Sequence, residues 1–128
     1  MNEHVIKVLT EHLCYVATVG DGPNVVPIGY KKFIDDGSLI LADVGMETTK
    51  NNILANGQIA VVSCDPVTRE SYMIKGTATY LESGDIVDQL NRAAEKSSLP
   101  FRAKGAVIVR PEKVIVKHPG PDNNTEIE

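Results

Sequence analysis

The sequence predicts a small, mainly β fold, an antiparallel barrel with short α-helices over its openings. Six or seven apolar or alternating segments follow one another between glycine, proline and aspartate turns, and only three short segments are predicted to be helices. Strands and helices do not alternate as in a doubly wound sheet, and no GxGxxG motif follows a strand. The 128 residues fit one domain, predicted at 1–117, with a polar tail at 118–128.

The first half of the chain is predicted to form a helix followed by an antiparallel meander. Asn2 is suited to cap a helix whose apolar residues recur at helical spacing: Val5, Ile6, Leu9 and Leu13. Three strands are expected next, at 14–19, 24–34 and 38–43. Glycine-containing turns at 20–23 and 35–37 join them. Pro27 and Gly29, inside the second strand, indicate an edge, a bulge or a backbone left bare for a ligand to approach.

The second half begins with a short helix over 47–54, with Gly57 at its C-terminal cap. Strands follow at 58–64 and 71–81. Ser83 is expected to cap a third helix, which has the clearest apolar face of the chain and ends before Pro100. The segment 103–117 is either a strand pair or one long strand bent near Pro111. We expect the tail from His118 to Glu128 to be mobile unless a partner holds it.

Composition excludes several classes of protein. Thirteen basic and seventeen acidic residues give a net charge of −4, which argues against nucleic-acid binding. No apolar run approaches the roughly 20 residues that a membrane helix needs, and the first residues lack the pattern of a signal peptide. Cys14 and Cys64 both lie in apolar stretches, and we expect them to be buried free thiols in a reducing compartment. The predicted location is therefore the cytoplasm, with no membrane partner.

The usual catalytic and metal-binding motifs are missing from the chain. There is no GxSxG or HExxH motif, and His4, His12 and His118 have no ligand spacing, so we predict no metal site and no catalytic side chain. A chain of this kind either only binds a ligand or takes its chemistry from a cofactor.

One candidate binding site lies where the third predicted strand ends and the second helix begins. The N-terminus of a helix presents unpaired backbone N–H groups and attracts anions. Thr48 and Thr49 would add hydroxyl donors there, and Lys50 would add a positive charge that opposes the helix dipole unless an anion is bound. The alternative is that a threonine only caps the helix while Lys50 points to solvent, toward Glu47.

A second candidate is the segment from Pro27 to Lys32. Gly29 leaves room for a flat ring to lie against the backbone, Tyr30 could stack on it or donate a hydrogen bond, and one lysine of the pair ending at Lys32 could reach a phosphate. The alternative is an ordinary bulged strand with a solvated lysine pair.

Together these segments resemble the pyridoxamine 5'-phosphate oxidase-related FMN-binding split-barrel family. The resemblance rests on four stretches: Val26–Lys32, Asp36-Gly37, Gly45–Leu54 and Ile74–Ala78. It extends in order from about Leu9 to Val116. It implies a six-stranded antiparallel split β-barrel of Greek-key type, and a homodimer with one FMN in each interface groove. Apolar residues expected on the outer face of the barrel, such as Val107 and Val109, also favour a dimer.

The resemblance also assigns cofactor-binding residues. The family places a Lys/Arg-Thr-x-x-Asn-Leu motif at the FMN phosphate, and Thr49, Asn52 and Ile53 match it. Thr48 stands where the family has its basic residue, so Lys50 or Lys32 would have to replace that charge. The residues expected along the flavin ring are Pro27, Ile28, Gly29 and Tyr30, with Asp43 and Val44 near its polar edge.

The function implied is that of an FMN-binding flavoprotein acting in electron transfer, or as a small flavin-dependent oxidoreductase, with an unknown redox partner. Oxidation of vitamin B6 is not expected, because the end of the chain, Asp122–Glu128, is acidic and would repel a phosphorylated substrate. One alternative is a non-catalytic module that binds haem or a phosphorylated metabolite. The other is a deazaflavin-dependent relative, which would carry a more basic groove.

Overall fold

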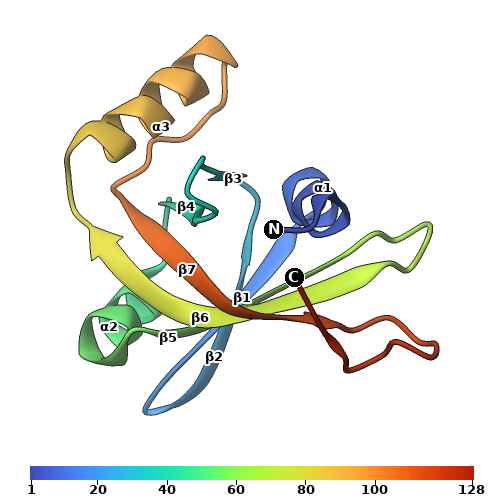
Figure 1. Ribbon diagram of the computed structural model, residues 1–128. Coiled ribbons are helices and arrows are strands. Elements are labelled where there is room, and N and C mark those ends of the chain that lie inside the picture. Colours follow the sequence, from blue (N-terminus) through green and yellow to red (C-terminus); the bar gives the residue numbers. More distant parts are fainter.

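The computed structural model describes residues 1–128 and consists of one curled antiparallel sheet with three helices (Figure 1). The helices are α1 (Glu3–Glu11), α2 (Glu47–Asn56) and α3 (Asp85–Lys96). The strands are β1 (Cys14–Gly20), β2 (Gly22–Ile28), β3 (Lys31–Phe33), β4 (Leu39–Asp43), β5 (Gln58–Cys64), β6 (Ser71–Leu81), β7 (Gly105–Val116) and β8 (Glu126–Ile127). None of the three helices is long and apolar enough to cross a membrane.

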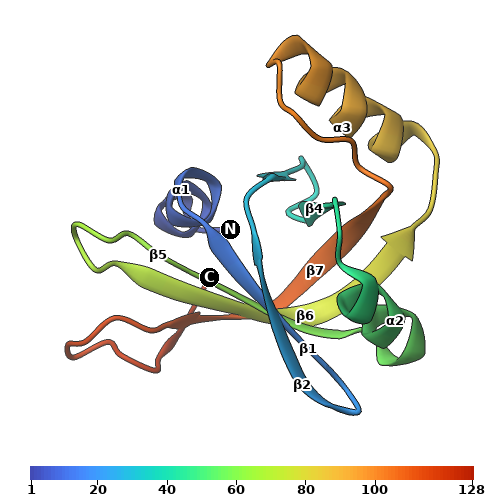
Figure 2. The ribbon, with the colours of Figure 1, turned by 180° about the vertical axis from the view of Figure 1, so that it is seen from behind.

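The strands lie in the order β2-β1-β5-β6-β7-β4-β3, and β8 pairs with β7. Every pairing is antiparallel, so the predicted mainly β fold class is confirmed. The sheet has eight strands where six were expected. One extra strand arises because the segment 24–34 breaks at Gly29 and Tyr30 into β2 and β3, and the other is the short β8. α1 and α2 lie apart from each other in both Figure 1 and Figure 2, and both helices contribute residues to the core inside the curled sheet.

The segment 103–117 forms one long strand, β7, which pairs with β6 along most of its length. The pairing register shifts between Lys75 and Gly76, where Gly76 faces Pro111. A Cβ atom at Gly76 would lie 2.1 Å from the carbonyl oxygen of Arg110, so only glycine allows the two backbones to approach this closely. The bend near Pro111 therefore belongs to a continuous strand.

The main core fills the curl of the sheet and includes Val16, Leu41 and Ile74, all fully buried. α1 covers one side of it with Val5, Val8 and Leu9. A second, smaller core lies under α3 and consists of six residues: Ile40, Ala42, Val87, Leu90, Ala103 and Ala106. Val107 and Val109 are fully buried in the main core, so the prediction that they lie on an outer face was wrong.

The predicted N-cap of α1 and C-cap of α2 are correct, but the predicted N-cap of α3 is wrong. The Asn2 side chain caps α1 by accepting the backbone N–H of His4 at 2.7 Å. Gly57 ends α2 in the left-handed conformation, with φ 69°. The residue before α3 is Gly84, with φ 115°, and no side chain caps that helix. Ser83 does not cap α3 because the chain turns into the helix one residue later, at a φ that favours glycine.

The tail from His118 to Glu128 folds back onto the chain instead of remaining free. The backbone N–H of Val116 donates to Thr125 at 3.0 Å, and that of Asn2 donates to Glu128 at 2.9 Å, so the two chain ends meet (Figure 1). The tail therefore needs no partner to hold it.

The two cysteines differ, against the expectation that both are buried. Cys14 is fully buried, and burial raises the pKa of its thiol. Cys64 is exposed, because it ends β5 on the face that the alternation of the strand turns outward.

Candidate functional site

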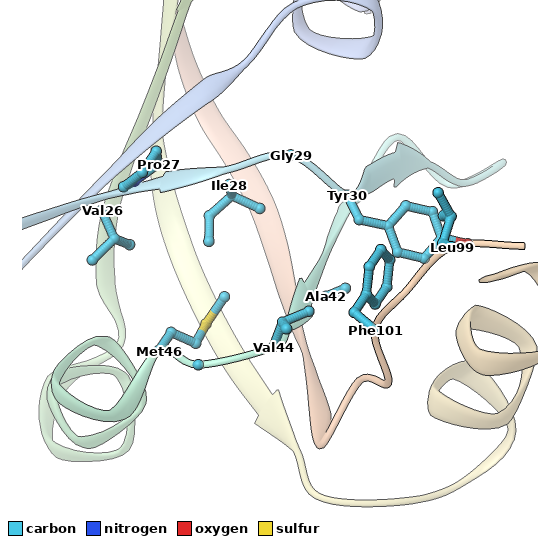
Figure 3. A pocket seen from close by; sticks show the side chains of 11 residues that line it. Val26, Pro27, Ile28, Gly29, Tyr30, Ala42, Val44, Met46, Leu99 and Phe101 are labelled. Carbon is cyan, nitrogen blue, oxygen red and sulfur yellow. The ribbon is translucent and has the colours of Figure 1, made fainter.

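An apolar pocket of about 550 Å³ opens where three connections meet: the break between β2 and β3, the link from β4 to α2, and the loop after α3. Eleven residues line it: Val26, Pro27, Ile28, Gly29, Tyr30, Ala42, Val44, Gly45, Met46, Leu99 and Phe101. Figure 3 shows Tyr30, Leu99 and Phe101 gathered at one end, with Val26 and Met46 at the other, beside the start of α2. The pocket is therefore elongated, and its far end reaches α2.

The aromatic end of the pocket is fixed by several contacts. The rings of Tyr30 and Phe101 lie 5.2 Å apart and are tilted by 53°. The Tyr30 hydroxyl donates to the carbonyl oxygen of Leu90 at 3.3 Å, and the Tyr30 carbonyl oxygen accepts the N–H of Ala42 at 3.0 Å. The Tyr30 ring is therefore held between α3 and β4 and cannot swing freely into the pocket.

Gly29 leaves the middle of the pocket bare. A Cβ atom built there meets nothing within 4 Å. The neighbouring Lys31 is buried, and its ammonium group donates to the carbonyl oxygens of His12 at 2.6 Å and Gly29 at 3.5 Å. Lys31 thus ties this stretch of backbone to the end of α1 and is not free to reach a ligand.

The pocket wall carries unpaired backbone donors. The N–H groups of Gly29, Tyr30, Val44 and Gly45 donate to no acceptor within the chain, although these four residues line the pocket. Nearly all other lining groups are apolar side chains. Apolar walls with a few placed backbone donors are typical of binding sites for small molecules and cofactors.

The start of α2 adds further unpaired donors. The first-turn N–H groups of Glu47, Thr48 and Thr49 have no acceptor within the chain. The N–H of Met46, just before the helix, donates to Asp43 Oδ1 at 2.8 Å. The N–H groups of the exposed residues Val44, Gly45, Glu47 and Thr48 are therefore available to an anion or to an acceptor atom, whereas Thr49 is buried.

Asp43 holds this turn in place and is itself only 3% exposed. Its second carboxylate oxygen accepts a hydrogen bond from the Tyr80 hydroxyl. Burial, followed by this hydrogen bond and the negative charge of Asp43, raises the pKa of Tyr80 well above its ordinary value. Both oxygens of Asp43 are therefore occupied by the protein, and its role is to position the wall between Val44 and Met46.

Pro27, Ile28, Gly29, Tyr30 and Val44, all predicted from the sequence, line the pocket together. Asp43 and Lys50 line a neighbouring polar hollow of about 280 Å³ instead. That hollow shares Met46 with the apolar pocket, so the two adjoin.

The residues that were predicted to bind the phosphate do not all face one site. Thr48 is exposed in the first turn of α2, whereas Thr49 is 1% exposed and its hydroxyl accepts a hydrogen bond from the Asn24 amide at 3.1 Å. Lys50 lies 3.4 Å from Glu82, not toward Glu47. Lys32 is exposed on β3 and lines neither cavity.

Leu99 and Phe101 line the pocket without having been predicted from the sequence. They lie in the loop after α3, where no periodic pattern indicates a buried face. The available signal was composition: two large apolar residues flank Pro100 within an otherwise polar stretch, and Leu99 remains 40% exposed at the pocket mouth.

A curled antiparallel barrel whose open pocket combines apolar walls with backbone donors defines a class of small split-barrel ligand-binding proteins. A family model described as pyridoxamine 5'-phosphate oxidase matches residues 2–118. The chain belongs to this family, which confirms the resemblance that the sequence motifs indicate.

The chain is also similar to one protein by sequence and to two solved structures by fold. An uncharacterized protein of Methanocaldococcus jannaschii is 30% identical over 129 residues, covering 95% of this chain and 84% of the relative. The structure of HupZ from Group A Streptococcus has a TM-score of 0.84 at 22% identity and covers 98% of both chains. An FMN-binding protein from Syntrophomonas wolfei has a TM-score of 0.77 at 15% identity, covering 89% of this chain and 84% of the other. Because both solved structures are less than 25% identical to this chain, the similarity shows a shared fold and no more.

Proposed function

We propose that this chain is an FMN-binding flavoprotein whose isoalloxazine ring lies in the apolar pocket. The observation that carries the proposal is the pocket wall, where the unpaired N–H groups of Gly29, Tyr30, Val44 and Gly45 stand among apolar side chains. A flavin ring is flat and apolar over most of its area and has acceptor atoms along one edge. Membership of the family and the likeness to an FMN-binding protein support the choice of cofactor.

The residues present fit the ring well. Ile28, Val44 and Met46 would pack on it, since Figure 3 shows these side chains around the same space, and Gly29 leaves room for it. The phosphate would lie at the start of α2, against the N–H groups of Glu47 and Thr48 and the exposed Thr48 hydroxyl. Thr49 would act indirectly, because Asn24 occupies its hydroxyl.

We also propose that two copies of the chain associate through the outer face of β1, β2 and β5. Alternate residues of β1 point outward, and Tyr15 is paired with Pro27 and Val62 on the neighbouring strands. Tyr15 is 47% exposed and Val25, opposite Ala17, is 61% exposed. This apolar sheet face continues directly into β2, whose end lines the pocket, so a second copy there would also shield the bound ring from water.

The chemistry divides between the cofactor and the chain. Bound FMN would supply one- or two-electron transfer. The chain would orient the ring, exclude water with its apolar wall and donate backbone hydrogen bonds. Tyr30 is the one side chain with a titratable group on the wall, and its hydroxyl is already bonded to Leu90. This absence of a free acid or base on the wall favours electron transfer, or a simple flavin-dependent oxidoreductase, with a redox partner still to be identified.

The proposal is tested by titrating FMN with cofactor-free protein and following the quenching of flavin fluorescence. We expect saturable binding with one FMN per chain. Hemin, a phosphorylated sugar and a deazaflavin are the comparison ligands. If one of these binds saturably while FMN does not, the chain is a binding module of another kind and the flavin proposal fails. Analytical ultracentrifugation of wild type and Tyr15→Glu tests the dimer, which the added charges should dissociate.

A further inference from the structure

The positive charge nearest the start of α2 is already engaged within the protein. The Lys50 ammonium nitrogen lies 3.4 Å from Glu82 Oε1 and 4.9 Å from the centroid of the Tyr80 ring. In an α-helix each residue is rotated by about 100° from the one before, so Lys50 lies roughly 200° around α2 from Thr48. The lysine therefore extends toward β6, away from the face of the helix that Thr48 occupies.

The polar hollow into which Lys50 extends carries more negative than positive charge. Three carboxylates line it, those of Asp43, Glu47 and Glu82, against the ammonium groups of Lys50 and Lys104. The hollow adjoins the apolar pocket at Met46. A phosphate dianion placed at the start of α2 would gain hydrogen bonds from free N–H groups, but it would also meet this negative field.

We propose that Glu82 limits how strongly the site selects for the phosphate of its ligand, because it acts as an internal counter-ion for Lys50. The inference rests on the proposed function and names the ligand group that the same site discriminates. The wild-type chain binds FMN and riboflavin with affinities that differ by less than about tenfold. Neutralising Glu82 releases Lys50, removes one negative charge from the hollow, and shifts the preference toward FMN.

The exposure of the pair makes this exchange physically accessible. The Glu82 side chain is 75% exposed and that of Lys50 is 33% exposed. Ion pairs of this kind are weak because water solvates both partners, so the release of Lys50 accounts for only part of the expected effect. The same solvent screens the repulsion between Glu82 and a phosphate, which limits the expected gain to roughly 3- to 10-fold in FMN affinity.

The experiment measures the dissociation constants of FMN and riboflavin for wild type and Glu82→Gln at low and high ionic strength. The matched control is Glu112→Gln, which removes the same charge from an exposed residue of β7 that lines neither cavity. We expect Glu82→Gln to bind FMN about 3- to 10-fold more tightly at low salt and riboflavin equally well within about twofold, with the difference shrinking at high salt. The control should leave both constants unchanged.

A double variant shows whether Lys50 is the residue that is released. In a Lys50→Met background, Glu82→Gln should raise FMN affinity clearly less than in wild type. The substitution still removes a negative charge from the hollow, but there is no longer a Lys50 ammonium group to release. The inference is overturned if Glu82→Gln leaves the ratio of FMN to riboflavin affinity unchanged, or if wild type already prefers FMN by clearly more than about tenfold. If neither flavin binds wild type, the proposed function fails and this inference fails with it, whereas binding of both with an unchanged ratio refutes the inference alone.

Discussion

Replacing Gly29 with leucine should weaken flavin binding strongly without destabilising the fold. Gly29 lies at the break between β2 and β3 and lines the pocket, and a Cβ atom there meets nothing within 4 Å. Its φ lies outside the left-handed region, so a side chain is tolerated by the backbone. Substituting glycine at such a position commonly raises stability by about 0.4–1 kcal/mol, because the unfolded chain becomes less flexible.

The loss of affinity follows from the contact that the ring would lose. If the leucine side chain keeps the flavin from about 100 Å² of apolar wall, the loss of binding free energy is about 2.5 kcal/mol, at about 25 cal/mol per Å². That free energy corresponds to a dissociation constant that is roughly 70-fold larger. The assay is the FMN fluorescence titration, run beside urea unfolding of the same samples. Ala93→Leu, at an exposed position on α3, adds comparable apolar volume and should change neither quantity by much.

Two outcomes would refute this reasoning. An undiminished FMN affinity in Gly29→Leu would mean that the ring does not lie against this strand break. A fall of more than about 1 kcal/mol in the free energy of unfolding would mean that the position is not open as the structure has it.

Three further predictions concern the framework of the site. Thr49→Val should lower the free energy of unfolding by about 1–2 kcal/mol in a urea titration, since the Asn24 amide loses its acceptor, while FMN affinity changes less than in Thr48→Ala. Asp43→Ala should lower the free energy of unfolding by about 2–4 kcal/mol, because the Met46 N–H and the Tyr80 hydroxyl lose their buried acceptor, and Asp43→Asn should lower it by less. Equal losses in the two variants would contradict the role of Asp43 as this acceptor. Burial, followed by the 2.5 Å hydrogen bond to Glu70, raises the pKa of Tyr72 to about 12. The contribution of Tyr72 to stability is therefore complete below pH 10 and is lost as the pH rises through about 12. Urea unfolding across this pH range should show a smaller loss of stability in Tyr72→Phe than in wild type.

Most of the fold follows from local signals in the sequence. The Asn2 cap, the Gly57 cap and the strand at 71–81 depend on neighbouring residues, and each was predicted correctly. The split of 24–34 into two strands was missed, although Pro27 and Gly29 marked the region. Where a bulge becomes a full break depends on the partner strands, since β2 pairs with β1 and β3 pairs with β4 at the other edge of the sheet.

The tail was misjudged for a related reason. Its composition of proline, glycine, asparagine and acid is typical of mobile segments, and only the two residues of β8 pair with β7. Several of the hydrogen bonds that hold the tail are made between backbone groups, such as that of the Asn124 N–H to the Val116 carbonyl oxygen at 2.8 Å, and the Lys117 ammonium group adds a bond to Asn124 Oδ1 at 2.7 Å. Backbone partners leave no pattern in the side chains, so the sequence carried no signal of them.

The candidate site was only partly predictable. The stretch from Pro27 to Tyr30 and the turn at Val44 were predicted and do line one pocket. The burial of Thr49 could not be anticipated, because it depends on Asn24, which is 25 residues earlier in the chain and on another element. The direction of Lys50 follows from helix geometry once the start of α2 is known, but its partner Glu82 depends on how α2 packs against the end of β6.

The central claim is tested most directly by the visible absorption spectrum of the purified protein, followed by chromatography of what heat releases from it. The account predicts a yellow protein that releases FMN at one molecule per chain. A colourless protein that also takes up no added FMN would contradict the account, because an apolar wall with four unpaired backbone donors would then serve a ligand other than a flavin.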